Sequence, residues 1–447
     1  MKDDEARTIL EDLLVRARKA GADAADALIY HAVSSGVSWR LGKLEDVERS
    51  EGRDLGLRIL VGQRQASVST TDFSKTGLEE LVERCAAMAK AAPEDPWCGL
   101  APEDRLAKPP FPDLDLGDFD EPDTETLKAR AAACEEAALA IEGVVNSSGA
   151  GASYGEGSKW FATTAGFFGA SGGARHSVSV SVLAEDAKGM ERDYDYDSKT
   201  HYADMRAPEE IGRRAGERAV ARLSPRKLKS QAAPVIYDKR LSDSLIGHLA
   251  GAINGAAIAR GVSFLKTKKG EAVFPKGMNV IDDPYIKRGH GSRPFDGEGV
   301  AGERLKVIED GVLTCWLMNS AHARQLGLET NGRASRGVAS PPGAGPTNFY
   351  LEAGEKSVAE LMAGVGKGLF VTEMFGPQVN PNTGDYSVGC SGYWFEDGAR
   401  AYPVSEITIA GNLLEMYGAL LAADDLEFTG SINAPSLLVG RMTIAGD

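Results

Sequence analysis

The sequence lacks the segments that would carry a chain into or across a membrane. No run of about 18 apolar residues occurs, and the most apolar stretch, residues 413–423, contains Glu415. The first residues, MKDDEARTILEDLLVRARKAG, alternate acidic and basic side chains where a signal peptide has a basic end followed by an apolar stretch. We therefore expect no membrane span and no export signal.

The chain is also short of cysteine and of positive charge. Its five cysteines are an odd number and lie far apart, at positions 85, 98, 134, 315 and 390, which is not typical of a disulfide framework. Lys and Arg number 50 against 65 Asp and Glu, so the formal net charge is -15 and the surface repels phosphate backbones. We expect a reduced, cytoplasmic protein that makes no direct contact with nucleic acid.

Metal-binding motifs are missing too. A zinc ion gathers three or four His, Cys or carboxylate donors at about 2 Å, but the six histidines stand singly and neither HExxH nor CxxC occurs. His248 is interpreted as a core residue on the same helical face as Leu249, and Cys390 as a small packed residue rather than a nucleophile. The sequence therefore predicts no catalytic and no metal-ligating residue in this chain.

Three glycine-rich patterns match known motifs in letters but not in context. Residues 169–173 fit G-x-S-x-G, yet the strand-like HSVSVSV follows where a nucleophile elbow needs a helix. Residues 364–368 lack the Ser or Thr that must follow the lysine of a phosphate loop, and they are interpreted as a turn. The glycines within residues 149–155 miss the dinucleotide-binding spacing and lead into no helix.

What the first half does contain is a change of period. Residues 4–20 and 75–92 place apolar side chains at helical steps, and the segments between them alternate as strands. Residues 93–122 hold seven prolines, which indicates an extended connection. Because helix, strands and helix recur over residues 123–223, we predict a duplicated α/β unit with an antiparallel sheet. The N-terminal α/β domain is expected to span residues 1–225.

The second half has a different character. One helix is predicted near residues 240–259, and the rest is rich in Gly and Pro with short strands. We expect a β-rich C-terminal domain over residues 230–447, and hence an α+β protein. Within the helix, Gly247, Gly251 and Gly255 repeat every four residues although each costs about 1 kcal/mol relative to alanine. We therefore expect a neighbouring backbone or an extended peptide to approach that face closely.

Turn chemistry marks two further segments of this half. The stretch NPNTGD, residues 380–385, and the segment that begins at Asn331 carry polar side chains that can bond their own backbone. An Asp397-Gly398 hairpin is followed by a strand that carries Pro403, which favours a position near a sheet edge. Such an edge can accept a partner strand.

Four segments of the second half together resemble the PmbA/TldD family, historically called modulators of DNA gyrase. They are LIGHLAGAINGAAIARGVSFLK (245–266), SRPFDGEGV (292–300), TNGRASRGVASPPGAGPTNFYLEAGE (330–355) and NPNTGDYSVGCSGYWFEDGARAYPVSEITIAGN (380–412). The N-terminal pattern is compatible, so the resemblance covers most of the chain. It implies a two-domain α+β subunit that works as a dimer in the intracellular proteolysis of small or unfolded polypeptides.

The family has two branches that differ in chemistry. Subunits of the TldD type are similar to zinc metallopeptidases with H-E-x-x-x-H on a helix, in which two histidines hold zinc and the glutamate activates water. Aligned from the segment RGVSF, those three positions fall here on Ile246, Gly247 and Gly251. A shift that begins at His248 places aliphatic residues at the other two positions. The chain therefore resembles the PmbA branch, also called TldE, which lacks the metal site.

The resemblance implies a non-catalytic subunit of a cytoplasmic zinc metallopeptidase complex. A TldD-type partner would supply zinc and the base in a heterodimer, this chain would bind no cofactor, and a homodimer of the chain alone is left open. A chamber between the subunits would hold an unfolded peptide by backbone hydrogen bonds. The candidate peptide-binding residues, each of which could instead serve only to fix a loop, are Gly247, Gly251, Asn331, Arg333, Asn380 and Asp385.

Two other functions stay open. A self-sufficient hydrolase would use a dispersed site, such as Cys390 with His322 or His290. A protein-binding modulator of DNA gyrase would take the historical label literally, and the net charge of -15 opposes contact with DNA but permits contact with a protein. Enzyme activity of the isolated chain is therefore undecided by the sequence.

Overall fold

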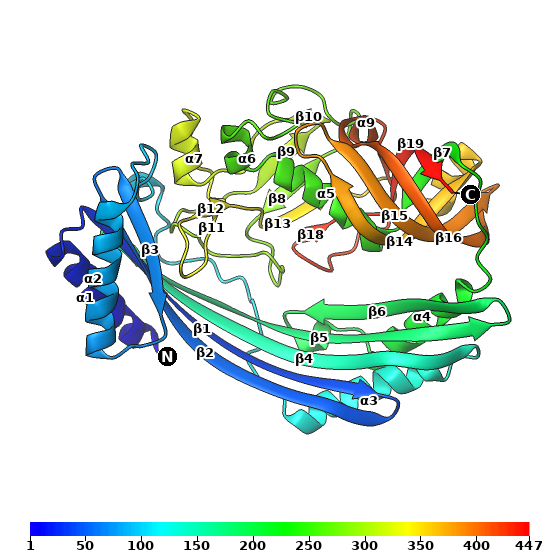
Figure 1. The fold of residues 1–447 in the computed structure, drawn as a ribbon, viewed down its shortest axis with the longest axis horizontal. Helices are drawn as coiled ribbons and strands as arrows, with labels where there is room; N and C mark the ends of the chain where they lie inside the picture. Colours follow the sequence, from blue (N-terminus) through cyan, green and yellow to red (C-terminus); the bar gives the residue numbers. More distant parts are fainter. Residues whose placement is uncertain (447) are drawn as a thin grey trace.

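The structure, a computed structural model, describes residues 1–446 and has two parts (Figure 1). The first half of the chain forms a long, curved antiparallel sheet with helices on one face. The second half forms a strand-rich part that lies over the opposite face of that sheet. Among residues 1–446, no helix is long and apolar enough to cross a membrane.

The N-terminal sheet has six antiparallel strands in the order β3-β2-β1-β4-β5-β6. Helix, three strands and helix occur twice along the chain, and the two copies join where β1 pairs with β4. The predicted recurrence of element order is confirmed. The elements are α1 (Asp3–Lys19), β1 (Ala24–Arg40), β2 (Lys43–Val61), β3 (Arg64–Thr70), α2 (Lys75–Ala91), α3 (Thr124–Leu139), β4 (Val144–Thr163), β5 (Phe168–Asp186), β6 (Gly189–Lys199) and α4 (Pro208–Ala221).

All four of these helices cover the same face of the sheet. Ile29 of β1 packs under α1 and α2, and Val37 of the same strand packs under α3 and α4. The two positions are an even number of residues apart, so they point to one face. Leu28 and Phe161 point to the other face and pack against Phe295 from the C-terminal part. The sheet therefore has a helix-covered face and a face that meets the second domain.

Local sequence sets the limits of the helices. Helix α1 has acidic residues in its first turn and basic residues in its last, which complements the helix dipole. The Ser74 hydroxyl accepts a hydrogen bond from the Gly77 N–H at 3.1 Å at the start of α2. The Asp123 carboxylate accepts from the Thr126 N–H at 2.8 Å at the start of α3. The observed helices agree with the two that the N-terminal periodicity predicts.

Strand β6 is the element that the sequence analysis missed. Its sequence, GMERDYDYDSK, alternates acidic and aromatic residues, and its three aspartates are buried. Asp195 is 5% exposed and accepts hydrogen bonds from Arg206 at 2.8 Å and from Arg218 at 2.9 Å. Arginines from other segments pair with these buried aspartates. A sequence pattern that is typical of a solvated segment therefore forms the edge strand of a folded sheet.

The Pro-rich connection is extended, as predicted. Within residues 92–123, all of which the structure describes, the one helical piece is a short 3-10 turn (Glu103–Arg105). The Ala107 N–H donates to the Gly299 carbonyl at 2.9 Å, and the Phe111 ring lies 5.1 Å from that of Phe295, centroid to centroid. The connection therefore lies against the C-terminal part.

Five strands of the C-terminal part close into a ring. Strands β16, β15, β14, β7 and β19 pair in that order, and β16 pairs with β19 from Thr408, opposite Ala445, to close it. Helix α5 packs its apolar side chains, among them Leu245 and Leu249, into the core beside the ring. The elements are β7 (Gln231–Tyr237), α5 (Lys239–Ala252), α8 (Val358–Val365), β14 (Lys367–Val379), β15 (Asp385–Glu396), β16 (Ala399–Asn412), α9 (Leu413–Gly418), β17 (Leu421–Ala422) and β19 (Leu437–Ala445).

A second sheet completes this part, in the order β10-β9-β8-β13-β18. The β-rich character predicted for the C-terminal region is confirmed. The remaining elements are α6 (Gly255–Ala259), β8 (Val280–Asp283), β9 (Leu305–Glu309), β10 (Val312–Leu313), α7 (Ser320–Gln325), β11 (Ala334–Ser335), β12 (Gly343–Ala344), β13 (Asn348–Leu351) and β18 (Ile432–Asn433).

Candidate functional site

The helix predicted near residues 240–259 is two helices, which corrects the sequence analysis. The Asp238 carboxylate begins α5 by accepting a hydrogen bond from the Arg240 N–H at 2.9 Å. The helix ends at Ala252, because the Asn254 side chain accepts from the Ala256 N–H at 2.9 Å and begins α6. An asparagine inside the predicted helix is thus the cap of the next one.

The break also divides the glycine stripe. A Cβ on Gly255, in α6, would stand 3.0 Å from the Leu317 carbonyl oxygen, so a backbone does approach closely there. A Cβ on Gly247 would meet its nearest neighbour at an ordinary 3.7 Å, and one on Gly251 would meet nothing within 4 Å. A neighbouring backbone is therefore found at Gly255, whereas no backbone of the described residues lies within 4 Å of the Cβ positions of Gly247 and Gly251. The approach of an extended peptide to these two glycines stays a prediction.

The three positions that would carry a zinc motif lie on α5. The Ile246 side chain is fully buried in the core, Gly247 is half-buried and Gly251 is exposed. None of the three has a side-chain atom that could bind a metal, so these residues do not fit a zinc ion. Within residues 1–446, no group of three or more His, Cys, Asp or Glu side chains is placed to hold a metal ion.

The dispersed hydrolase site has unfavourable chemistry. The Cys390 side chain is 1% exposed in the C-terminal core, and burial raises the pKa of its thiol to about 12. A thiol of that pKa is not a nucleophile at neutral pH. His248 lies edge-on to the ring of Tyr386 at a centroid distance of 6.0 Å, and burial lowers the pKa of its imidazole. Both residues pack as the sequence analysis interpreted them.

Arg333 is buried and Asn331 is half-buried, and both side chains are hydrogen-bonded to other parts of the chain. The Arg333 side chain is 0% exposed, forms an ion pair with Asp282 and donates a hydrogen bond to the Asn331 carbonyl at 2.9 Å. The Asn331 amide accepts from the Met318 N–H at 2.9 Å and donates to the Trp316 carbonyl at 2.8 Å. These side chains fix a loop, and a peptide could reach Arg333 only if that loop opened.

Asn380 and Asp385 lie together at the tip of the β14–β15 hairpin. The Asn380 N–H donates to the Asp385 carbonyl at 2.9 Å, and the Asn380 side chain accepts from the Asn382 N–H at 3.0 Å. The Asp385 carboxylate accepts from the Thr383 hydroxyl at 2.7 Å. The predicted turn chemistry is thus present. Among described residues, no hydrogen bond or ion pair joins this tip to Arg333 or to α5, so the six candidates form three separate groups.

The predicted Asp-Gly hairpin is present, and its sheet edge is partly occupied. Asp397 and Gly398 have φ of 50° and 82°, as a tight hairpin turn requires. Pro403 lies on β16 opposite Tyr393, and its carbonyl accepts a hydrogen bond from the Arg226 N–H at 2.9 Å. At this point, therefore, the chain itself contacts the edge that could accept a partner strand.

Two groups of ion pairs hold the two parts of the molecule together. At one end of the sheet the Asp26 carboxylate lies between Arg58, at 2.5 Å, and Arg336 of the C-terminal part, also at 2.5 Å. All three side chains are at most 3% exposed. Near the other end, Asp193 of β6 accepts from Arg240 of α5 at 3.0 Å. We call the first group, Asp26 with Arg58 and Arg336, the charged joint.

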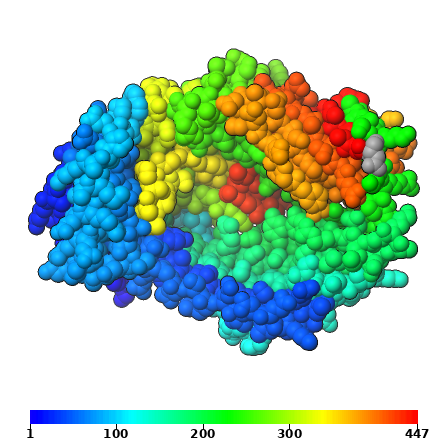
Figure 2. Space-filling view, viewed as in Figure 1, coloured from blue at the N-terminus to red at the C-terminus, as the bar shows by residue number. Residues whose placement is uncertain are grey.

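Between these ion pairs the surface is hollowed, and the sequence analysis missed a cavity there. Figure 2 shows the hollow between the long sheet and the C-terminal part. A cavity of about 310 Å³ is lined by β1, β4 and β5 and by the loop of residues 289–294. Lys159 and Arg175 are the cations that the sheet contributes. The available signal was the alternation of Gly155, Gly157 and Lys159, since residues two apart share a strand face.

Comparison with protein families assigns most of the chain to three consecutive domains of one family. Residues 25–89 match PmbA/TldA metallopeptidase domain 1, residues 117–223 match the central domain, and residues 230–446 match the C-terminal domain. These matches agree with the fold, in which the sheet comes first and the strand-rich part second.

Individual proteins of known name are similar to this chain over nearly its whole length. Metalloprotease PmbA of Escherichia coli O157:H7 is 36% identical over 445 residues, which cover 98% of this chain and 97% of the relative. The PmbA homolog of Haemophilus influenzae is 33% identical over 449 residues, 100% of this chain and 97% of the relative. A solved structure of a proposed DNA gyrase modulator from Bacteroides thetaiotaomicron matches with TM-score 0.92 and 27% identity over 100% of both chains. TldE from Thermococcus kodakarensis shares the fold, with TM-score 0.87 and 19% identity over 98% of this chain and 99% of that one.

Proposed function

Because this chain belongs to the PmbA/TldA metallopeptidase family, here called PmbA/TldD, we propose that it is a subunit without a metal site in a zinc peptidase complex of the cytoplasm. A TldD-type partner would supply the zinc ion and the base, and the complex would degrade or process unfolded peptides. The relatives named above are described as metalloproteases or as modulators of gyrase, and the proposal concerns this chain alone.

The observation that carries the proposal is the surface of α5. Where the zinc-binding branch would have two histidines and a glutamate, this helix has Ile246, Gly247 and Gly251. The first points into the core, and the second and third have no side chain beyond Cα. Zinc needs lone-pair donors at about 2 Å, and this face provides none. Any metal chemistry of the complex would therefore have to come from the partner.

A role in peptide binding is supported by the shape of the chain. The sheet and the C-terminal part enclose a hollow (Figure 2). The exposed backbone at Gly251 meets nothing within 4 Å of its Cβ position, so another chain could approach it. Extended peptides are held in such places through main-chain hydrogen bonds, with little dependence on sequence. This is the form of recognition that the processing of unfolded peptides requires.

The test compares the chain alone with the chain mixed with a TldD-type subunit. Zinc per chain is measured by mass spectrometry after mild dialysis, and cleavage is followed with a fluorescence-quenched unstructured peptide. We expect zinc well below one per chain and no cleavage for the chain alone. The mixture should co-purify, contain zinc and cleave the peptide.

A matched control variant keeps the complex intact but abolishes its peptidase activity. In the partner, replacement of the glutamate of H-E-x-x-x-H by glutamine should abolish cleavage while co-purification and zinc content persist. One zinc and cleavage by the chain alone would overturn the proposal. Cys390→Ala should leave cleavage by the complex unchanged, because the thiol is buried and its pKa is about 12.

A further inference from the structure

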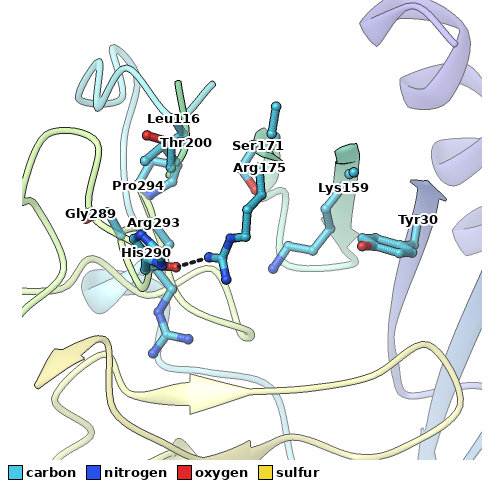
Figure 3. Close-up of a pocket in the computed structure, with 16 residues that line it drawn as sticks. Tyr30, Leu116, Lys159, Ser171, Arg175, Thr200, Gly289, His290, Arg293 and Pro294 are labelled. Atoms are coloured by element: carbon cyan, nitrogen blue, oxygen red, sulfur yellow. Dashed lines mark hydrogen bonds between the residues drawn. The ribbon is translucent and has the colours of Figure 1, made fainter. Parts of the chain in front are cut away.

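The cavity at the seam is built on a pair of glycines. Gly157 of β4 lies opposite Gly173 of β5 on the sheet face that meets the C-terminal part. A Cβ on Gly157 would stand 2.7 Å from the Tyr30 hydroxyl, and one on Gly173 would stand 3.2 Å from the Leu116 carbonyl oxygen, so both glycines allow close packing at the cavity wall. Lys159 follows Gly157 by two residues, and Arg175 follows Gly173 by two residues. Because the strands are antiparallel, the two cations stand on opposite sides of the glycine pair, about 14 Å apart along the strands. Long side chains span that distance, and both extend into the cavity (Figure 3).

The opposite wall is a loop held in a fixed position. The Gly291 N–H donates to the Asn348 side chain at 2.8 Å, and the Arg293 N–H donates to the Pro284 carbonyl at 3.0 Å. Arg293 and His290 from this loop line the cavity together with the two cations of the sheet (Figure 3). The cavity therefore lies between two preformed walls, one from each part of the molecule.

The cations of this cavity have almost no partners. Among described residues, Lys159 makes no hydrogen bond or ion pair, and its ammonium lies 5.7 Å from the centroid of the Phe295 ring. Arg293 Nε is buried without a partner, and Arg293 Nη2 reaches only the Gly345 carbonyl at 3.5 Å. Arg175 donates one long hydrogen bond, 3.4 Å, to the His290 carbonyl. No lining residue in the described chain is Asp or Glu.

Asp296, a carboxylate whose charge acts on Lys159, is hydrogen-bonded to other groups. Asp296 is 1% exposed, and its oxygens accept hydrogen bonds from the N–H groups of Glu298 and Val300 at 2.8 and 2.9 Å. It also accepts from the Ala334 N–H at 2.8 Å. Asp296 therefore attracts Lys159 only through space. Lys159 and Arg293 are half-buried, whereas Arg175 is exposed at the rim. A desolvated cation without a counter-charge destabilises a protein, so the two half-buried cations favour a compensating anion in the cavity.

We propose that this cavity binds a carboxylate of a peptide, either its C-terminal carboxylate or that of an acidic side chain. The inference rests on the proposed function, because a peptidase subunit meets carboxylates chiefly on peptides. A volume of about 310 Å³ is at the small end of ligand pockets, so it admits the end of a chain or one side chain rather than a longer segment. Arginine and lysine are the usual partners of carboxylates.

The ionisation of the site agrees with this assignment. Burial, and then the positive charge of Arg293, lowers the pKa of Lys159 to about 8, with Arg336 acting in the same direction and Asp296 opposing. Burial, followed by the charges of Arg175 and Lys199, lowers the pKa of His290 to about 4, so its imidazole is neutral at pH 7. A bound carboxylate would favour the charged ammonium of Lys159. Binding should therefore weaken as pH rises above about 8.

The experiment measures binding to the full chain alone by calorimetry at pH 7. The probes are acetyl-pentaalanine with a free carboxylate, the same peptide as its C-terminal amide, an amidated acetyl-Ala-Ala-Glu-Ala-Ala, and inorganic phosphate. We expect the free carboxylate peptide to bind at least tenfold more tightly than the alanine amide. Binding of the glutamate peptide at comparable strength would identify the side chain as a second source of the carboxylate. Lys159→Met and Lys159→Glu should weaken binding about tenfold and more than tenfold, respectively.

The control variant is Lys188→Met, which removes one cation from the exposed β5–β6 turn and should leave binding unchanged. Equal binding of the carboxylate and amide peptides, or binding insensitive to Lys159→Met, would overturn the inference. So would binding of phosphate without binding of either carboxylate peptide. Because these measurements need neither a partner nor cleavage, they separate failure of this site from failure of the proposed peptidase role.

Discussion

Two groups of charges lie on the same face of the N-terminal sheet, and only one of them contains an anion. In the charged joint, Asp26 is shared by Arg58 and Arg336, with one nitrogen of each guanidinium 2.5 Å from a carboxylate oxygen. A few residues along the sheet, past the aromatic cluster of Phe161 and Phe295, Lys159 has no partner among described residues. The difference indicates that the joint serves the fold, whereas the cavity serves a ligand.

The two regions also differ in what burial does to their ionisation. Burial alone would raise the pKa of Asp26, but the charges and hydrogen bonds of Arg336 and Arg58 hold it below the ordinary value of 3.8. At Lys159 burial acts with little opposition, and the pKa is lowered to about 8. The surroundings therefore stabilise the charged form of Asp26 and destabilise the charged form of Lys159. Substitutions at the two places should therefore have opposite effects on stability.

The largest effect is expected at the charged joint. Asp26→Asn leaves two buried arginines without a counter-charge, and loss of one partner of a buried ion pair costs about 3–5 kcal/mol. The free energy of unfolding, measured by urea denaturation at pH 7, should fall by that amount. Asp46→Asn, at an exposed site on β2, should change it by less than about 0.5 kcal/mol. A loss below about 1 kcal/mol at Asp26 would remove the distinction between the two regions.

Acid should remove the difference in unfolding free energy between the native chain and Asp26→Asn. The folded-state pKa of Asp26 is below the unfolded value, so its contribution to stability is complete above pH of about 4 and disappears as pH falls through the folded pKa. The difference in unfolding free energy between the native chain and Asp26→Asn should therefore be constant near neutrality and shrink in acid. A difference that grew as the pH fell would contradict the assignment of an ionised Asp26.

Regular periodicity made much of this fold predictable. Leu10, Leu13 and Leu14 recur at helical steps and are buried in α1, and Ser74 is the cap at the start of α2. Strand β6 escaped because its buried residues are aspartates whose partners are arginines distant in sequence, such as Arg240 of α5. Hydrophobic pattern cannot identify a strand whose inner face is charged.

The candidate site was predictable only in part. The residues of α5 could be aligned to a metal motif because they are consecutive, but the helix break at Asn254 depends on a cap that competes with continued helix. The cavity depends on the register that sets Gly157 opposite Gly173 and on a loop more than a hundred residues away that carries Arg293. Such long-range pairing cannot be derived from local sequence.

A smaller effect, of the opposite sign, is expected in the cavity. Lys159→Met removes an unpaired, half-buried cation and should raise the unfolding free energy at pH 7 by roughly 1 kcal/mol. The folded-state pKa of about 8 lies below the ordinary 10.5, so between these values the folded chain loses its proton first and the native protein becomes more stable as pH rises. The advantage of the variant should therefore vanish by about pH 10.5. Destabilisation at pH 7 would show that Lys159 has a structural partner.

The smallest and most specific change would give the cavity an anion of its own. Ser171 lies directly opposite Lys159 in the β4–β5 register, so Ser171→Asp places a carboxylate beside the ammonium. Cross-strand charge pairs contribute roughly 0.2–1 kcal/mol, so we expect a stabilisation of that size and a rise in the pKa of Lys159. The alkaline increase in stability should then disappear, and the carboxylate peptide should no longer bind. Ser171→Asn, nearly identical in shape but uncharged, should change none of these quantities. If Ser171→Asp left peptide binding intact, the cavity charges would not be what the peptide carboxylate contacts.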